Sequence, residues 1–142
     1  MKARVRLLEG LTFVAESGSG HAVVVDASPD IGGQDLGPRP MEMILMGLGT
    51  CSAIDVVHIL RKARQAVSDC VVELDADRAD EDPKVFTRIG IHYVVSGRSL
   101  ARAQVERAVK LSRDKYCSAT SMIAKTARIE IDFEIRDDSQ TQ

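Results

Sequence analysis

The stretch from residue 37 to residue 64 constrains the fold of this chain more than any other. Nearly every residue in the range 41–60 is apolar or small, and only Glu42, Asp55 and His58 interrupt the pattern. A helix that is apolar on all its faces has to be buried. Twenty such residues are also long enough to span a bilayer, but the three ionisable side chains would be unfavourable in lipid. We therefore predict the central helix of a soluble protein that does not enter a membrane.

Start and stop signals frame this predicted helix. Pro38 and Pro40 restrict the backbone just before it, and proline suits the first turn of a helix. Arg61, Lys62 and Arg64 follow the apolar run, and positive charges stabilise a helix C-terminus. The sequence thus predicts one long helix with Cys51 near its middle.

A helix of this kind has to be covered on two opposite sides. One sheet can cover the first side, but a chain of 142 residues then has few residues left to cover the second. A second copy of the helix, packed across a two-fold axis, would cover the other side. Gly47 and Gly49 lie within the helix, where small residues let another helix backbone approach closely. We therefore expect a homodimer with this helix at its centre.

The rest of the sequence contains several strand patterns and one further helix pattern. Apolar residues alternate with polar ones in short runs separated by turn residues, and they recur at helical spacing in one later segment. The predicted elements are strands at 3–8, 11–15 and 22–25, the central helix, strands at 70–76 and 85–95, a helix at 101–116, helical turns at 117–125, a strand at 128–136 and a frayed tail. Because the strands cluster, an antiparallel α+β fold in a single domain, residues 1–142, is favoured over a doubly wound one.

Composition excludes several classes of function. The net charge is −2, so no basic surface indicates nucleic-acid binding. The N-terminal residues have no apolar run of the length that a signal peptide needs, and we expect the protein in the cytoplasm. Three cysteines without disulfide-scaffold spacing are, in a reducing compartment, more often buried residues, ligands or nucleophiles than disulfides.

One stripe of the central helix carries Cys51, Asp55 and His58 at the spacing i, i+4, i+7. Three ligands in this arrangement span about 10 Å along one helix, which is too far to coordinate one metal ion. We therefore expect no metal site, and we expect Asp55 and His58 to form a structural pair.

The other two cysteines differ in their surroundings. Cys117 lies where one predicted helix ends and a short one begins, and a helix N-terminus favours a thiolate. Cys70 lies on an apolar strand face and is predicted to be inert. From the pattern alone, buried and unreactive side chains remain an alternative for Cys51 and Cys117 as well.

The order of elements, together with two motifs, resembles the OsmC/Ohr family. The motifs are GPRPMEMILMGLGTCSAIDV at residues 37–56 and KYCSA at residues 115–119. The resemblance implies an intertwined homodimer with its sites at the interface, and a thiol peroxidase that reduces organic hydroperoxides in oxidative-stress defence. It implies that Cys51 is the peroxidatic cysteine and Cys117 the resolving one. It also implies an external dithiol as reductant and no metal or organic cofactor.

The resemblance further implies an arginine beside the reactive cysteine, held by a glutamate directly after the proline that leads the helix. Met41 occupies that position here, and Glu42 follows it, a rotation of about 100° around a helix. Arg39 is the arginine nearest in sequence. Arg39 and Glu42 are therefore the candidates for this pair.

Three functions remain open at this stage. The first is a thiol-dependent organic hydroperoxide reductase. The second is an OsmC-like protein without peroxidase activity that binds a small apolar ligand at the dimer interface. The third is a redox switch that uses the two cysteines.

Overall fold

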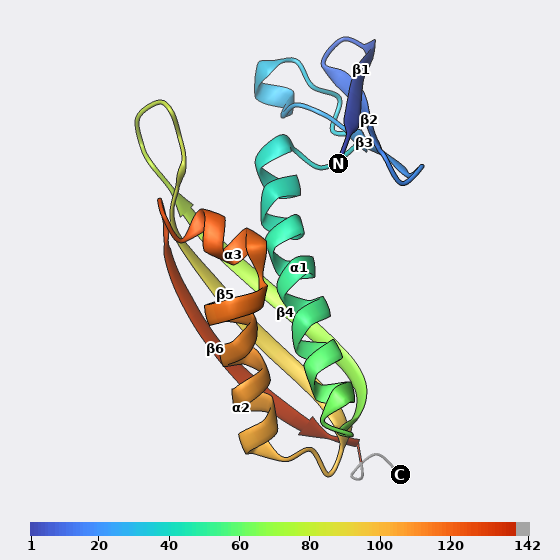
Figure 1. Cartoon of the computed structure of the whole chain (residues 1–142). Coiled ribbons are helices and arrows are strands. Elements are labelled where there is room, and N and C mark those ends of the chain that lie inside the picture. Colours follow the sequence, from blue (N-terminus) through green and yellow to red (C-terminus); the bar gives the residue numbers. More distant parts are fainter. Residues whose placement is uncertain (139–142) are drawn as a thin grey trace. The chain divides into compact units, whose positions relative to one another are not determined.

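The computed structural model describes residues 1–138 (Figure 1). The last four residues of the tail, which was expected to be frayed, lie outside the described part. The chain divides into two compact units, Met1–Met46 and a second that begins at Gly47. The division falls within the long helix α1 (Pro40–Lys62).

The first unit contains a three-stranded antiparallel sheet. Its strands are β1 (Ala3–Glu9), β2 (Thr12–Ser17) and β3 (Ala22–Val25), in the order β1-β2-β3. The predicted β-meander is confirmed, with boundaries that differ by one or two residues. All seven residues of β1 are exposed.

A buried carboxylate organises the loop between β3 and the helix, which includes the short 3₁₀ helix η1 (Pro29–Ile31). Asp26 accepts hydrogen bonds from the backbone N–H groups of Ala27, Gln34 and Leu36 at 2.8, 3.0 and 3.1 Å. Burial alone would raise the pKa of Asp26, but these hydrogen bonds favour the carboxylate and lower it overall. The Asp26 N–H also donates to the Pro38 carbonyl, 3.2 Å away, which ties β3 to the start of α1.

Helix α1 buries one face and exposes another. The buried residues recur every three or four positions: Leu48, Gly49, Ser52, Val56 and Leu60. Large apolar side chains remain exposed on the same helix, and Ile54 is 63% exposed. By length and composition alone α1 could cross a membrane, but the core helix of a soluble protein satisfies the same criterion. The predicted long helix is confirmed, and several of its large apolar side chains are exposed.

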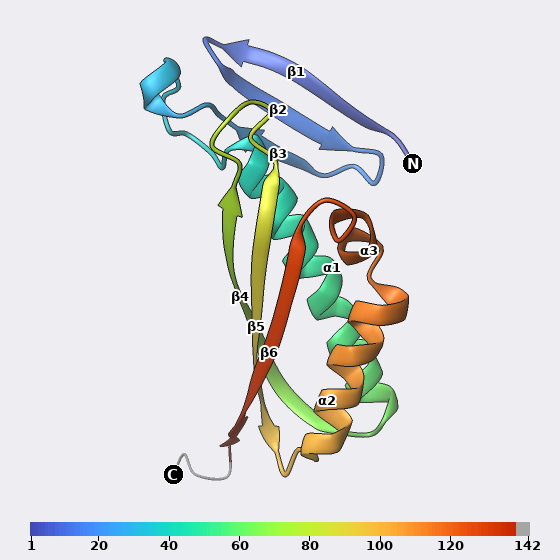
Figure 2. The ribbon, with the colours of Figure 1, turned by 90° about the vertical axis from the view of Figure 1, so that its left-hand side faces the viewer.

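The second unit contains the other sheet, with helices on one face (Figure 2). Its strands β4 (Ala66–Arg78), β5 (Phe86–Arg98) and β6 (Arg128–Asp137) lie in the order β4-β5-β6. The helical elements are the later part of α1, α2 (Arg102–Leu111), the π-helical turn η2 (Ser112–Tyr116) and α3 (Ser118–Ile123). The predicted α+β fold class is confirmed.

One detail of the predicted fold was wrong. Strands β4 and β5 pair antiparallel, but β6 pairs parallel to β5. A parallel neighbour needs a crossover connection, and α2, η2 and α3 together form that connection between β5 and β6. The sequence pattern of β6 alone could not reveal its direction, because alternation is the same either way along a strand.

The core of the second unit lies between the sheet and the helices. The inward residues of β5 are fully buried, including Ile89, Tyr93 and Val95, as their alternation predicts. Helix α1 contributes Leu48, Val56 and Leu60, and α2 contributes Val105 and Ala108. The middle of α1 is therefore fixed against β5 from one side.

The surroundings of the two glycines of α1, Gly47 and Gly49, differ from those predicted. A Cβ atom added to Gly49 would lie 2.6 Å from Leu74 Cδ1, so this glycine permits close packing against a strand side chain and not against a helix backbone. A Cβ atom added to Gly47 would meet nothing within 4 Å. Close packing is thus confirmed for Gly49, although its neighbour is the Leu74 side chain of β4 and not another helix. Within the described part of this chain, close packing is not found for Gly47.

Candidate functional site

The second unit brings Cys51 and Cys117 together. Cys51 is half-buried in the middle of α1, whereas Cys117 lies between η2 and α3 and is 2% exposed. The two side chains lie close together, because interaction with Cys51 is among the causes that raise the pKa of Cys117. Two cysteines that are distant in sequence therefore share one site.

Burial raises the pKa of the Cys117 thiol, since it disfavours the thiolate. Thr120 acts in the opposite direction: its backbone N–H donates to Cys117 Sγ over 3.4 Å, because Cys117 is the N-cap of α3. The hydrogen bond to Cys51 and the charge of Cys51 raise the pKa further, and the net shift is upward. The predicted helix N-terminus is thus present, but burial outweighs it and Cys117 stays a protonated thiol at neutral pH.

Behind the cysteines, four polar side chains form a chain of hydrogen bonds. The buried hydroxyls of Tyr93 and Ser52 bond to each other, and the Ser112 hydroxyl lies 3.5 Å from Ser52 Oγ. Ser112 donates to Asp55 Oδ2 over 3.2 Å, and its hydroxyl also lies 3.4 Å from the Ser52 carbonyl oxygen. The chain connects α1, which carries Cys51, to η2, which precedes Cys117. It therefore holds the two cysteine-bearing segments side by side.

The π-helical turn places Cys117. The Cys117 N–H donates to the Ser112 carbonyl oxygen, 2.9 Å away, across five residues. Single π-turns occur frequently at functional sites. Ser112 therefore binds the Cys117 backbone through its carbonyl and the α1 side chains through its hydroxyl.

Sequence reasoning missed Ser52, Tyr93 and Ser112. Buried polar side chains need partners, and Ser52 on an apolar helix next to Cys51 was a signal that one existed. Its partners could not be identified, because they come from β5 and η2, which are distant in sequence. Tyr93 lies on the inward face of β5 and is fully buried. Burial raises its pKa well above the usual value, and the charges of Cys117, Cys70, Asp55 and Cys51 raise it further.

The expected Asp55–His58 pair does not form within the described part of the chain. The hydrogen-bond partner of the Asp55 carboxylate is Ser112, and His58 is exposed. Among residues 1–138, no cluster of three His, Cys, Asp or Glu side chains has the arrangement to hold a metal ion.

Arg39 and Glu42 form an ion pair at the start of α1, in the first unit. Glu42 Oε2 accepts a hydrogen bond from the Arg39 backbone N–H over 2.8 Å, and Arg39 Nη1 lies 3.3 Å from Glu42 Oε1. The backbone hydrogen bond is the main cause that lowers the pKa of Glu42, and the Arg39 charge assists it. Arg39 Nη2 also lies 3.4 Å from Asp35. This geometry is the acidic half of a capping box, and catalytic roles for Arg39 and Glu42 stay predictions.

Cys70 lies half-buried on β4. Burial raises its pKa, and the neighbouring charge of Asp69 raises it further. This thiol therefore stays protonated at neutral pH, and its inertness stays a prediction.

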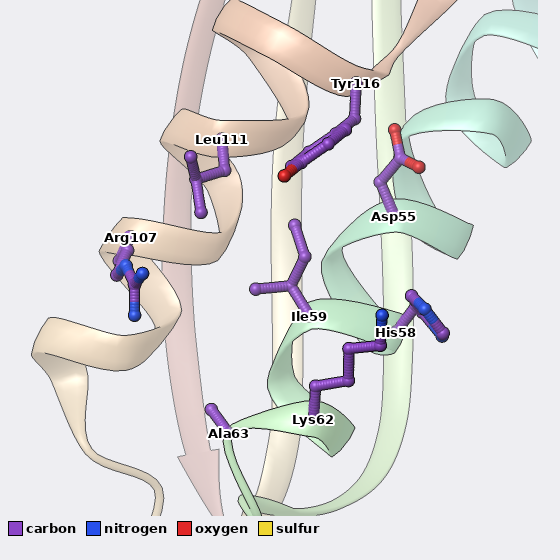
Figure 3. Close-up of a pocket in the computed structure, with 8 residues that line it drawn as sticks. All are labelled: Asp55, His58, Ile59, Lys62, Ala63, Arg107, Leu111 and Tyr116. Atoms are coloured by element: carbon purple, nitrogen blue, oxygen red, sulfur yellow. The ribbon is translucent and has the colours of Figure 1, made fainter.

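A pocket of about 510 Å³ lies between α1 and the α2–η2 segment, and neither Cys51 nor Cys117 is among its lining residues (Figure 3). Asp55 on its wall is one helical turn beyond Cys51, and Tyr116 directly precedes Cys117. Its lining residues are Asp55, His58, Ile59, Lys62, Ala63, Arg107, Leu111 and Tyr116. The second unit thus holds two neighbouring thiols and, on the same helices, a separate cavity large enough for a small organic molecule.

Comparison with known proteins assigns the family. The family described as OsmC-like protein matches residues 32–132. The chain is 50% identical over 135 residues to Protein YhfA of Escherichia coli K12, covering 95% of this chain and 98% of that protein. It also resembles the crystal structure of a hypothetical protein from Aquifex aeolicus VF5, with 32% identity, a TM-score of 0.85 and 96% of each chain covered. The organic hydroperoxide resistance protein OhrB of Bacillus subtilis shares the fold, with 16% identity, a TM-score of 0.63 and 94% and 98% of the two chains covered. With its fold, its paired cysteines and these relatives in agreement, the chain belongs to the OsmC family.

Proposed function

We propose that this protein is a thiol-dependent peroxidase that reduces organic hydroperoxides through Cys51 and Cys117. The observation that carries the proposal is the contact between the two thiols, one half-buried and one buried. Support also comes from the shared fold with a protein named for organic hydroperoxide resistance. The proposed role is defence against oxidative stress in the cytoplasm.

The reaction follows from ordinary thiol chemistry. The Cys51 thiolate attacks one oxygen of the O–O bond, which breaks; Cys51 becomes a sulfenic acid, and the other oxygen leaves as an alcohol after taking up a proton. The Cys117 thiol then attacks the sulfenic sulfur, so a disulfide forms and water leaves. An external dithiol reduces this disulfide and regenerates both thiols.

The raised pKa of Cys117 fits a residue that does not attack the peroxide itself, because a protonated thiol is a poor nucleophile. Oxidation of Cys51 to a sulfenic acid removes the thiolate charge that raises the pKa of Cys117, so the Cys117 thiolate forms more easily for the second step. The activating cation for Cys51 is proposed to be an arginine of a second copy, with Arg39, Arg4 and Arg6 as the candidates.

The direct test is turnover of cumene hydroperoxide with dithiothreitol, compared with hydrogen peroxide. We expect faster turnover of the organic peroxide, abolished in Cys51→Ser. Cys117→Ser should accumulate a sulfenic acid that dimedone traps. Cys70→Ser is the matched control and should keep full activity.

Mass spectrometry after one equivalent of peroxide identifies the disulfide. A Cys51–Cys117 bridge is expected, and a bridge to Cys70 or no bridge would contradict the mechanism. A Cys51–Cys117 bridge without turnover would favour the redox switch. Lack of both, with an apolar ligand retained on purification, would favour the ligand-binding function.

We also propose that the functional unit is a homodimer. The central helix keeps large apolar side chains exposed, among them Ile44, Met46 and Ile54. Strand β1 is exposed along its whole length, and a small sheet with both faces in water is marginally stable. A second copy of this chain is the partner with matching apolar surface.

A further inference from the structure

The π-helical turn η2, which leads to Cys117, is mostly exposed. Of its five residues only Ser112 is buried, and the other four are exposed. Arg113 and Asp114 form an ion pair with each other, which joins the turn to no other element. A segment with few buried side chains opens easily. Ser112 is therefore the residue of this turn that is placed to anchor it.

Both backbone groups of Cys117 bond within the crossover between β5 and β6. The Cys117 N–H donates to the Ser112 carbonyl oxygen over 2.9 Å, and the Ser121 N–H donates to the Cys117 carbonyl oxygen over 3.0 Å. Ser112 belongs to η2 and Ser121 to α3. These bonds fix Cys117 relative to Ser112, but they do not fix it relative to α1.

The Ser112 side chain supplies the connection to α1. Its hydroxyl is fully buried and lies 3.2 Å from Asp55 Oδ2 and 3.5 Å from Ser52 Oγ. Ser52 directly follows Cys51 in the chain, and Asp55 is one helical turn beyond Cys51. The carboxylate is a charged acceptor, which makes the stronger kind of hydrogen bond. One hydroxyl thus joins the turn before Cys117 to the stretch of α1 that carries Cys51.

The hydroxyl groups of this site are satisfied together when they all donate in one direction. In that direction Tyr93 donates to Ser52, and Ser52 donates to Ser112. Ser112 then donates to the carboxylate of Asp55, which only accepts and so sets the direction. The Tyr93 hydroxyl joins α1 to β5, whereas the Ser112 hydroxyl joins α1 to η2. The two ends of the chain of hydrogen bonds therefore have different roles.

We propose that Ser112 is a positioning residue for the resolving step, which holds the Cys117 thiol beside Cys51 before the disulfide forms. This inference rests on the proposed function, because it concerns the second step of that reaction. Without the Ser112 hydroxyl, the turn leaves α1 for part of the time in the reduced protein, and disulfide formation has to order it again.

This role has a kinetic signature. The rate and the equilibrium constant of disulfide formation both fall in proportion to the fraction of reduced protein in which the turn is in place. The rate at which a dithiol reduces the finished disulfide stays the same, because the Cys51–Cys117 bond itself then holds the turn. A general loss of stability does not produce this combination.

The experiment is equilibration of the full chain with mixtures of reduced and oxidised glutathione. The two protein thiols give two electrons and two protons to glutathione disulfide, which yields the Cys51–Cys117 bridge and two molecules of glutathione. All proteins carry Cys70→Ser, which removes the third thiol. Alkylation followed by mass spectrometry measures the oxidised fraction, and the same method follows the rates of formation and of reduction by dithiothreitol.

Ser112→Ala should lower the equilibrium constant about ten-fold, since it removes a hydrogen bond to a charged group. The rate of formation should fall by the same factor, and the rate of reduction should not change. Asp55→Ala removes one of the two acceptors at a half-buried position and should lower the equilibrium constant about three-fold. It also tests the inference if Ser112→Ala does not fold.

Two further variants separate positioning from general stability. Tyr93→Phe removes a buried hydroxyl of the same chain of hydrogen bonds but leaves both bonds from Ser112 to α1, so its effect should be smaller than that of Asp55→Ala. Val105→Ala is the control for stability, because Val105 is fully buried on α2. It should lower the free energy of unfolding in urea and leave the equilibrium constant with glutathione unchanged.

An unchanged equilibrium constant in Ser112→Ala would overturn the inference, as would an equal fall in Tyr93→Phe or Val105→Ala. A fall caused by faster reduction instead of slower formation would also contradict it. If the Cys70→Ser protein with no further substitution forms no Cys51–Cys117 bridge at any glutathione ratio, the proposed function fails and this inference fails with it. A bridge whose equilibrium constant does not depend on Ser112 overturns this inference alone.

Discussion

At the scale of single residues, Cys117 is governed by opposing effects. Burial raises its pKa most, the Thr120 N–H lowers it, and Cys51 raises it again through a hydrogen bond and its charge. A free thiol titrates near pH 8.5, so Cys117 is largely protonated in the cell. A protonated thiol of this kind competes poorly for the peroxide, and in the proposed resolving step it has to lose its proton before it attacks the sulfur that oxidises first.

This balance predicts the effect of removing Cys51. In a Cys70→Ser background, Cys51→Ala should lower the pKa of Cys117, because one raising contact is lost, but burial should keep it above the ordinary value. The measurement is the pH dependence of the Cβ chemical shift of labelled cysteine. Cys70→Ser alone is the control, and an unchanged or higher Cys117 pKa would show that the two thiols do not interact.

At the scale of elements, α1 offers a matched pair of glycines. Gly47→Ala should stabilise the protein by about 1 kcal/mol through helix propensity, since its added Cβ meets nothing within 4 Å. Gly49→Ala should be about 1–3 kcal/mol less stable than Gly47→Ala, because overpacking against Leu74 offsets the same gain.

Urea unfolding at one fixed protein concentration measures both changes. In a double-mutant cycle, adding Leu74→Ala to Gly49→Ala should recover part of the stability that overpacking removes. Equal changes in the free energy of unfolding for the two glycine substitutions would show that the Leu74 side chain moves aside without loss of stability. Destabilisation by Gly47→Ala would instead show that a neighbour from a second copy packs against this position.

The pairing of β5 with β6 contains a titratable contact. His92 Nδ1 lies 2.7 Å from Asp132 Oδ1, and the two residues are partners across the parallel pair. The hydrogen bond to Asp132 raises the pKa of His92, and the charges of Asp132, Glu134 and Glu73 add to this shift. Protonated His92 therefore stabilises the sheet.

The sign of the pH dependence follows from this raised pKa. The stabilisation is fully present below the unfolded histidine pKa, about 6.5, and is lost as the pH rises through the folded value. Asp132→Asn should lower the free energy of unfolding near about pH 6 and have little effect near about pH 9. His21→Gln, at an exposed histidine of the first unit, is the control for urea unfolding at both pH values. An equal effect of Asp132→Asn at both pH values would contradict the pair.

At the scale of the whole molecule, the exposed apolar face of α1 predicts an obligate homodimer. Ile54→Glu should weaken dimerisation, because it places a charge where a 63% exposed isoleucine would be buried. Met122→Glu is the control, since Met122 on α3 is 71% exposed and belongs to a different surface. Sedimentation at micromolar concentration measures the mass, and a stable folded monomer of the unsubstituted chain would contradict the prediction.

The sequence by itself determined the elements of this protein and the residues to suspect. Apolar periodicity depends only on neighbours along the chain, so it located the meander, the long helix and the alternating strands of residues 66–137. It also identified Cys51 and Cys117, because a cysteine in an apolar helix and one at a helix start are visible in the sequence. The resemblance of two short motifs was sufficient to name the family.

Only the tertiary structure decided what these residues contact. The direction of β6, the partner of Gly49 and the bonds joining Ser52, Tyr93 and Ser112 depend on segments far apart in the chain. The pocket could not be recognised in the sequence, because its lining residues come from the end of α1 and from the α2–η2 segment, which are far apart in the chain. Local patterns fix local conformation, whereas packing between distant segments sets the surroundings in which a thiol titrates or a ligand binds.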